Sequence, residues 1–221
     1  MSETKTEAAD MTQQELNPSQ RVIAYLTNPR GDRLHPKGVA HANWWKVSDH
    51  MAEALVEALI HQKWPVVLVG KVGLGKSCAM ACIYRGWRKH ALWRNSGDLL
   101  SRVMDCRFSR TKSITVPRPD GGTLEEFEQS IYRKIQGADL LCLDDVGVKA
   151  PTEAQREVFN NIIDLRNGKP TVLTTNLDHD QFTEVFDDRT FSRVFSGTVI
   201  RVQAKDRRFE GTKVINVKED Q

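Results

Sequence analysis

The sequence predicts one α/β domain with a five-stranded parallel sheet flanked by helices. From Pro65 onward, short apolar runs alternate with segments whose apolar residues recur at helical spacing, which is typical of a parallel sheet covered on both faces. The length of 221 residues suits one such domain with short extensions. A composition of 39% hydrophobic and 28% charged residues is that of a globular protein. The sequence contains no apolar run of about 18 residues, so no membrane-spanning helix is expected.

The two ends of the chain differ in composition from its middle. Residues 1–20 carry one lysine and four acids with few apolar side chains, which predicts a disordered tail. Residues 21–47 are rich in Pro and Gly, so we expect an N-terminal arm or linker. The folded domain is expected over 48–215, with a C-terminal tail at 216–221. The N-terminus lacks a secretory segment and the four cysteines lack disulfide spacing, so we expect a cytoplasmic protein.

The individual elements follow from local patterns. Residues 48–62 place apolar side chains at helical spacing, with Ser48 as the expected N-cap. Two later helices are expected to begin with a capping box, formed by Thr123 with Glu126 and by Thr152 with Gln155. The remaining elements expected, in chain order, are a strand at 66–69, a helix at 77–89, a strand at 91–94, a short helix through Leu99 and Val103, a helix at 123–136, a strand at 139–145, a helix at 152–167, and strands at 171–175 and 198–202.

A glycine-rich segment connects the first strand to the helix after it. Its sequence, GKVGLGKS at 70–77, fits the pattern G-x-x-x-x-G-K-[ST], in which backbone N–H groups face phosphate oxygens at a helix N-terminus. Lys76 is expected to reach the β- and γ-phosphates of ATP, and Ser77 to ligate Mg²⁺. The predicted ATP-binding residues of this loop are Gly70, Val72, Gly73, Gly75, Lys76, Ser77 and Cys78.

Two further strands of this P-loop NTPase end in polar side chains. The apolar run LLCL is followed by Asp144 and Asp145, and TVLTT is followed by Asn176. The carboxyl ends of parallel strands meet at one edge of the sheet, beside the phosphate loop. We therefore expect Asp144 to hold Mg²⁺, Asp145 to polarise the attacking water, and Asn176 to contact the γ-phosphate.

These motifs together resemble the AAA+ ATPases, and within them the DnaC/DnaI/IstB group of helicase loaders and transposition helpers. The resemblance covers about residues 48 to 210 and rests on VGLGKS, ADLLCLDDVG, RNGKPTVLTTNL, DDRTFSRV and KDRR. It implies an AAA+ domain in which ATP lies between two protomers. Because the chain ends soon after KDRR, little or no C-terminal lid is expected.

The resemblance also implies roles for three arginines. Arg189 and Arg193 stand four residues apart, on one face of an expected helix. They resemble the segment that supplies an arginine to the γ-phosphate of a neighbouring protomer, and Arg193 is the preferred candidate. A guanidinium suits this role because it stays charged and forks onto phosphate oxygens. Arg208 resembles the arginine that contacts the nucleotide of its own protomer, with Arg207 as the alternative.

A basic stretch lies between these motifs. Residues 85–118 contain nine Lys or Arg and two acids, an asymmetry that favours an anionic partner. In the resembling family this region helps to line a DNA channel, and such phosphate contacts are largely independent of sequence. The residues expected to contact DNA are Arg102, Arg107, Arg110 and Lys112.

The leading interpretation is an ATP-hydrolysing replication factor that helps to place a replicative helicase on single-stranded DNA. It is expected to assemble into an ATP-dependent oligomer, and its hydrolysis to be slow and stimulated by DNA or partner. The nearest alternative is a transposition helper that acts on duplex DNA and recruits a transposase. A small-molecule kinase built on the same loop, and a scaffold that uses ATP only as an assembly signal, are alternatives of other classes.

Overall fold

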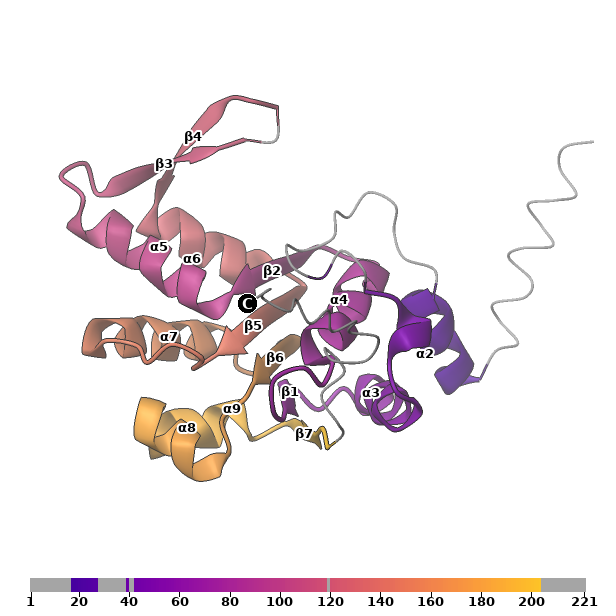
Figure 1. The fold of residues 1–221 in the computed structure, drawn as a ribbon. Helices are drawn as coiled ribbons and strands as arrows, with labels where there is room; N and C mark the ends of the chain where they lie inside the picture. Colours follow the sequence, from indigo (N-terminus) through magenta and orange to yellow (C-terminus); the bar gives the residue numbers. More distant parts are fainter. Residues whose placement is uncertain (1–16, 28–38, 40–41, 119, 204–221) are drawn as a thin grey trace, which may run out of the picture.

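The computed structural model describes residues 17–27, 39, 42–118 and 120–203, and its centre is a five-stranded sheet (Figure 1). The strand order is β2-β5-β6-β1-β7, and every neighbouring pair is parallel. The sheet predicted from the sequence is therefore confirmed. Its strands are β1 (Val66–Val69), β2 (Ala91–Asn95), β5 (Leu140–Val146), β6 (Thr171–Thr175) and β7 (Thr198–Arg201).

The central strand β1 shows how the sheet joins two hydrophobic cores. Successive side chains of a strand point to opposite faces. Val66 and Leu68 accordingly pack in one buried cluster, and Val67 and Val69 pack in the other. Both faces are apolar because helices cover both, which explains why β1 is apolar at all four positions.

The first face is covered by helices from the N-terminal part of the chain and by the helix after the phosphate loop. They are α2 (Pro18–Thr27), the 3₁₀ turn η1 (Trp44–Lys46), α3 (Asp49–His61) and α4 (Lys76–Gly86). Ser48 is the N-cap residue of α3, although its side chain makes no capping hydrogen bond.

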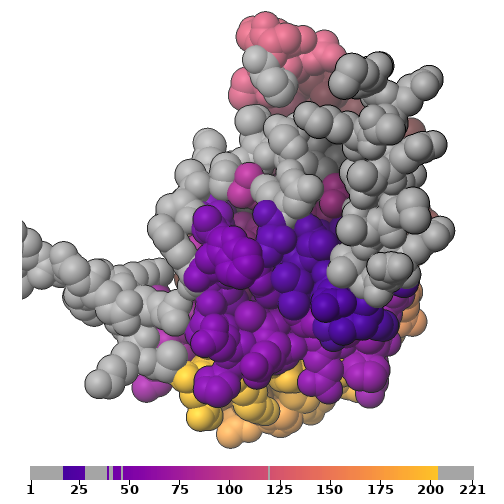
Figure 2. Space-filling view, turned by 90° about the vertical axis from the view of Figure 1, so that its right-hand side faces the viewer, coloured from indigo at the N-terminus to yellow at the C-terminus, as the bar shows by residue number. Residues whose placement is uncertain are grey.

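Helix α2 was not expected from the sequence, which predicted a tail and an arm over these residues. Leu26 is buried in the core, and a Cβ on Gly86 of α4 would lie 2.5 Å from the carbonyl oxygen of Tyr25. Gly86 thus allows the backbones of α2 and α4 to approach closely. Helix α2 also packs against α3, and its indigo surface adjoins the purple surface of the following part of the chain (Figure 2).

Within the part of the chain that the structure describes, five helices cover the second face of the sheet. A cluster of Phe side chains from α8 and α9 lies at one end of this core, where the rings of Phe182 and Phe186 are 4.8 Å apart. The helix predicted at 152–167 is present and begins with the predicted capping box of Thr152 and Gln155. The helices are α5 (Ser96–Phe108), α6 (Glu128–Gly137), α7 (Glu153–Leu165), α8 (His179–Phe186) and α9 (Asp188–Val194).

One sequence prediction is wrong between α5 and α6. Residues 123–127 form not a helix but strand β4 (Thr123–Phe127), which pairs antiparallel with β3 (Ser113–Pro117). The expected capping box at Thr123 is absent, and α6 begins at Glu128 with Ser130 accepting from the Phe127 N–H at 3.0 Å. The β3–β4 hairpin projects beyond the helices at one end of the molecule (Figure 1).

Candidate nucleotide-binding site

The phosphate loop leaves β1 and enters α4 through conformations that require glycine. Gly70 has φ 158°, and a Cβ there would lie 2.5 Å from the carbonyl oxygen of Val202, a contact that backbone cannot relieve. Gly73 and Gly75 have φ of 84° and 82°, in the left-handed region that glycine adopts at little cost. Gly75 is the N-cap residue of α4, so the loop N–H groups and the helix N-terminus face the same space.

Lys76 joins this loop to the end of a second strand. Its side chain is only 6% exposed, and its Nζ donates to the carbonyl oxygens of Gly70 at 2.6 Å and Lys71 at 2.8 Å. A third hydrogen bond runs to Oδ1 of Asn176, directly after β6, at 2.7 Å. The structure therefore brings together the lysine and the amide that were each expected to contact the γ-phosphate.

Ser77 and Asp144 form the second junction of the site. The Ser77 hydroxyl donates to Oδ1 of Asp144 at 2.8 Å, and the Thr174 hydroxyl donates to the same oxygen at 2.6 Å. Burial raises the pKa of the Asp144 carboxyl, and the neighbouring Asp145 charge adds to that rise against the opposing hydrogen bonds. A hydroxyl beside a carboxylate is an oxygen donor set that fits Mg²⁺, so these residues suit the metal that the sequence predicted.

Asp145 lies at an irregularity of β5, where the regular backbone conformation of the strand is interrupted. Its φ is 58°, and the register between β5 and β6 shifts between Leu143 and Val146. The Asp145 N–H donates to the Thr174 hydroxyl at 2.9 Å, which fixes this turn. Asp145 is half-buried, whereas Asp144 is nearly covered, so the two carboxylates occupy different environments.

Sequence reasoning missed two residues that shape this edge. The Thr174 hydroxyl donates to the Asp144 carboxylate and accepts from the Asp145 N–H. The sequence feature that could have identified it is a hydroxyl residue next to the end of a buried strand. Gly147 has φ 78°, and a Cβ there would lie 2.4 Å from Cδ1 of Leu177. Val72 and Cys78 lie within the loop segment, Val72 exposed and Cys78 half-buried.

The two arginines of the predicted trans-acting helix are both on α9, but their surroundings differ. Arg193 forms an ion pair through Nη1 with Asp164 of the neighbouring helix α7. The Thr190 hydroxyl bonds to Oδ1 of Asn160, so α9 is tied to α7 at two places. Arg189 is exposed. Burial raises the pKa of the neighbouring Asp187, but hydrogen bonds from Thr190, together with the Arg189 charge, outweigh burial and lower the pKa.

Arg207 and Arg208, one of which was expected to contact the nucleotide, lie outside the described residues. Among the residues that the structure describes, no helix is long and apolar enough to cross a membrane.

The basic residues of α5 and the following loop are partly engaged within the protein. Arg102 pairs with Glu126, and Arg107 pairs with Glu128 at 2.7 Å. Lys112 donates to the Arg107 carbonyl oxygen at 2.6 Å, and Arg110 is exposed. Two of the four residues predicted to contact DNA are therefore bound to carboxylates of this chain.

No protein-family model matches the sequence. Individual relatives do match, and the replicative helicase loader DnaC of Escherichia coli K12 is 25% identical over 138 residues, covering 62% of this chain and 52% of DnaC. The initiator DnaA of Pseudothermotoga lettingae is 32% identical over 144 residues, covering 64% of this chain and 30% of DnaA. The matched region thus spans about half the length of the DnaC relatives.

Solved structures match over a larger share of the chain. A crystal structure of the DnaC helicase loader superposes with a TM-score of 0.58 and 18% identity over 76% of this chain and 100% of that one. A DnaI structure superposes with a TM-score of 0.57 and 19% identity, over 78% of this chain and 94% of DnaI. AMPPCP-bound DnaA from Aquifex aeolicus superposes with a TM-score of 0.59 and 19% identity, over 80% of this chain and 54% of that one. These findings confirm the resemblance stated from the motifs: the chain has the AAA+ fold and is similar to DnaC, DnaI and DnaA.

Proposed function

We propose that this protein is an ATP-binding and ATP-hydrolysing DNA-replication factor of the helicase-loader type. The observation that carries the proposal is the junction of the phosphate loop with two strand ends, through Lys76 with Asn176 and Ser77 with Asp144. That junction supports the proposal because it joins the residues expected to contact phosphate, Lys76 and Asn176, and those expected to hold Mg²⁺, Ser77 and Asp144, in two hydrogen-bonded pairs. The sequence similarity to DnaC, a replicative helicase loader by name, supports the biological class.

The residues of the site divide the work of hydrolysis. Lys76 exchanges the loop carbonyls for phosphate oxygens. Ser77 and Asp144 would hold Mg²⁺, which would neutralise part of the phosphate charge. Asp145 orients a water, which forms a bond to the γ-phosphorus as the bond to the bridging oxygen breaks, yielding ADP and phosphate. Asn176 hydrogen-bonds the γ-phosphate and distinguishes ATP from ADP.

Completion of the site in the oligomer is assigned to Arg193 of a neighbouring protomer, with Arg189 beside it. In the described chain Arg193 is paired with Asp164, so assembly exchanges that carboxylate for a γ-phosphate. Because catalysis then requires two protomers, turnover by isolated chains is slow and rises with assembly on DNA or with a partner. Arg208, or Arg207, is the proposed contact to the nucleotide within the same protomer.

Single-stranded DNA is the proposed nucleic acid, and a replicative helicase the proposed protein partner. A solved DnaA structure similar in fold to this chain is bound to AMPPCP and single-stranded DNA, which supports the choice. Exposed Arg110 and the neighbouring Lys112 are the proposed first contacts with DNA phosphates, together with Arg102 through the N–H donors that Glu126 leaves unused and Arg107 once its carboxylates are displaced.

Sedimentation with a non-hydrolysable ATP analogue and either single-stranded or duplex DNA tests the proposal. We expect nucleotide-dependent assembly on single strands, and its loss in Arg193→Ala but not in the control Arg156→Ala, an exposed position on α7. Asp145→Asn is expected to keep assembly and to lose phosphate release. A monomer under every condition contradicts the proposal, and assembly on duplex alone points to a transposition helper.

A further inference from the structure

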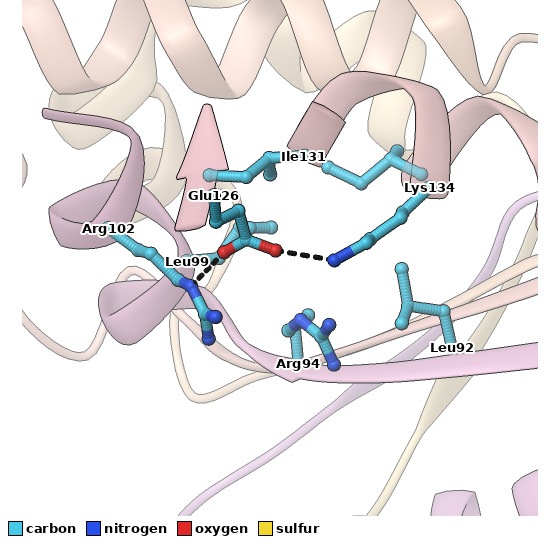
Figure 3. A pocket seen from close by; sticks show the side chains of 8 residues that line it. Leu92, Arg94, Leu99, Arg102, Glu126, Ile131 and Lys134 are labelled. Atoms are coloured by element: carbon cyan, nitrogen blue, oxygen red, sulfur yellow. Dashed lines mark hydrogen bonds and ion pairs between the residues drawn. The ribbon is translucent and has the colours of Figure 1, made fainter. Parts of the chain in front are cut away.

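A small pocket lies beside the edge strand β2, under helices α5 and α6 and at the base of the hairpin (Figure 3). Its enclosed space is about 10 Å³, room for about one water molecule, so a larger ligand would lie at its mouth, where Arg102 and Lys134 are partly exposed. The side chains of Leu92 and Arg94 enter it from one face of β2, on the opposite side of that strand from Trp93. The lining residues are Leu92, Arg94, Leu99, Arg102, Glu126, Ile131, Lys134 and Ile135.

Three cations and one carboxylate line this pocket, and two of the cations bind the carboxylate. Glu126 is 2% exposed and accepts from Nε of Arg102 on one side and from Nζ of Lys134, at 2.6 Å, on the other. Arg94 lies near this arrangement in Figure 3 and makes no ion pair with any described residue. The lining therefore carries a local excess of positive charge, although the pocket walls are otherwise apolar.

The cations keep donors that the protein itself does not use. Arg94 donates from Nη1 to the adjacent carbonyl oxygen of Trp93 at 2.7 Å, and Arg102 uses its Nε for Glu126. Within the described residues, Nη2 of Arg94 and both Nη groups of Arg102 make no hydrogen bond to protein. Burial, and then the charge of Arg102, lower the pKa of the Arg94 guanidinium, so the protein holds this charge at a cost. An anion at the mouth of the pocket offsets part of that cost.

We propose that Arg94, Arg102 and Lys134 form a phosphate-binding subsite, separate from the phosphate loop, that takes one backbone phosphate of single-stranded nucleic acid. The planar forks of two arginines suit the oxygens of a phosphate group, and Lys134 adds a point charge. Glu126 offsets one of the three positive charges, and one backbone phosphate offsets a second. The subsite rests on the proposed function for the source of its phosphate.

The position of the pocket relates it to the nucleotide site without merging the two. In the parallel pairing of β2 with β5, Arg94 stands opposite Leu143 and Asn95 stands opposite Asp144. The pocket is formed with α5 and α6, on the second face of the sheet, whereas the phosphate loop leads into α4 on the first face. A nucleic-acid phosphate held at Arg94 thus lies one strand away from the predicted Mg²⁺ ligand Asp144.

The test compares Arg94→Gln and Lys134→Gln with the control Arg133→Gln, which removes a charge from the exposed face of the same helix α6. Binding of fluorescent oligothymidylate is measured by anisotropy over a range of salt concentrations with the ATP analogue bound. We expect about tenfold weaker binding for each pocket variant, from loss of a charge-assisted hydrogen bond. The slope of log affinity against log salt falls by about 0.7, as for one lost contact to a single strand. Arg94→Lys is expected to keep the slope, and melting curves check that every variant folds.

A second arm uses inorganic phosphate, with the phosphate loop saturated by the analogue, and measures the thermal shift of the full chain. If phosphate stabilises the wild type but not Arg94→Gln, the phosphate-binding subsite is supported. If the wild type in that case binds no oligothymidylate, the proposed DNA contact is contradicted. If the wild type binds oligothymidylate and both pocket variants match the control in both assays, the subsite is wrong and the proposed function stands. Binding of neither probe by the wild type overturns both.

Discussion

Replacing Asp164 by Asn should strengthen nucleotide-dependent assembly of this protein. Asp164 holds Arg193 through an ion pair between α7 and α9, and Arg193 is the residue that we propose to reach a neighbouring protomer. The free chain must therefore break this pair each time an interface forms. Asparagine keeps the shape of the aspartate side chain and removes the charge that competes with the γ-phosphate.

The size of the effect follows from exposure. The side chains of Arg193 and Asp164 are 37% and 44% exposed, so water screens the pair, and such pairs contribute at most about 1 kcal/mol. Removing that competition raises the association constant by up to roughly fivefold at each interface. Helix α9 stays in place because the Thr190 hydroxyl still bonds to Asn160 of α7.

Sedimentation velocity over a range of protein concentrations, with the ATP analogue present, measures this shift. Glu184→Gln is the matched control because it removes a carboxylate from the exposed face of the adjacent helix α8. Assembly should begin at a lower concentration for Asp164→Asn than for the wild type or the control. Weaker assembly of Asp164→Asn, with an unchanged melting temperature, would refute the reasoning and make Arg193 a structural tether of α9.

Three further outcomes are expected. Gly70→Ala should cost about 2 kcal/mol of stability in thermal melts and lose nucleotide binding, because its Cβ meets the Val202 carbonyl oxygen at 2.5 Å; equal stability would contradict this packing. Mg²⁺-dependent ATP affinity should fall as the pH drops through the raised pKa of Asp144, hence above the usual 3.8, and Asp144→Asn should abolish this pH dependence in titrations of a fluorescent ATP analogue. Burial of Glu126 is outweighed by the hydrogen bond from Lys134 and the charge of Arg102, which lower its pKa. The stabilisation that the ionised Glu126 carboxylate gives the fold should be complete above pH 4.5 and lost as the pH falls through the lower pKa of the folded state. Glu126→Gln should therefore reduce the free energy of unfolding by about 2 kcal/mol at neutral pH and by much less in acid.

The sheet and the approach of the phosphate loop to two strand ends were predictable because their signals are local. The strand at 66–69, the glycine pattern after it and the carboxylates after LLCL each fit within one short segment. Parallel topology then brings strand ends to one edge, which is why Lys76 and Asn176 meet although they are 100 residues apart. Physical rules that act on short segments and on sheet edges were therefore sufficient to predict the sheet and the approach of Lys76 to Asn176.

The hairpin was not predictable in this way, because a local pattern and a tertiary contact compete at the same residues. Thr123 and Glu126 satisfy the spacing of a capping box, which favours a helix start. In the structure the Glu126 carboxylate is instead bound by Arg102 and Lys134, which come from two different helices. The pairing of Arg193 with Asp164 escaped prediction for the same reason, since nothing in either segment identifies the other as its partner.

The hydrogen bonds of Lys76 have a kinetic consequence for nucleotide exchange. Three protein oxygens occupy the Lys76 ammonium in the described loop, so the loop must release them before phosphates can enter. Entry is then limited by an opening step whose rate does not depend on nucleotide concentration. In stopped-flow experiments the observed association rate should level off as nucleotide is raised, and the plateau gives the frequency at which the empty loop opens.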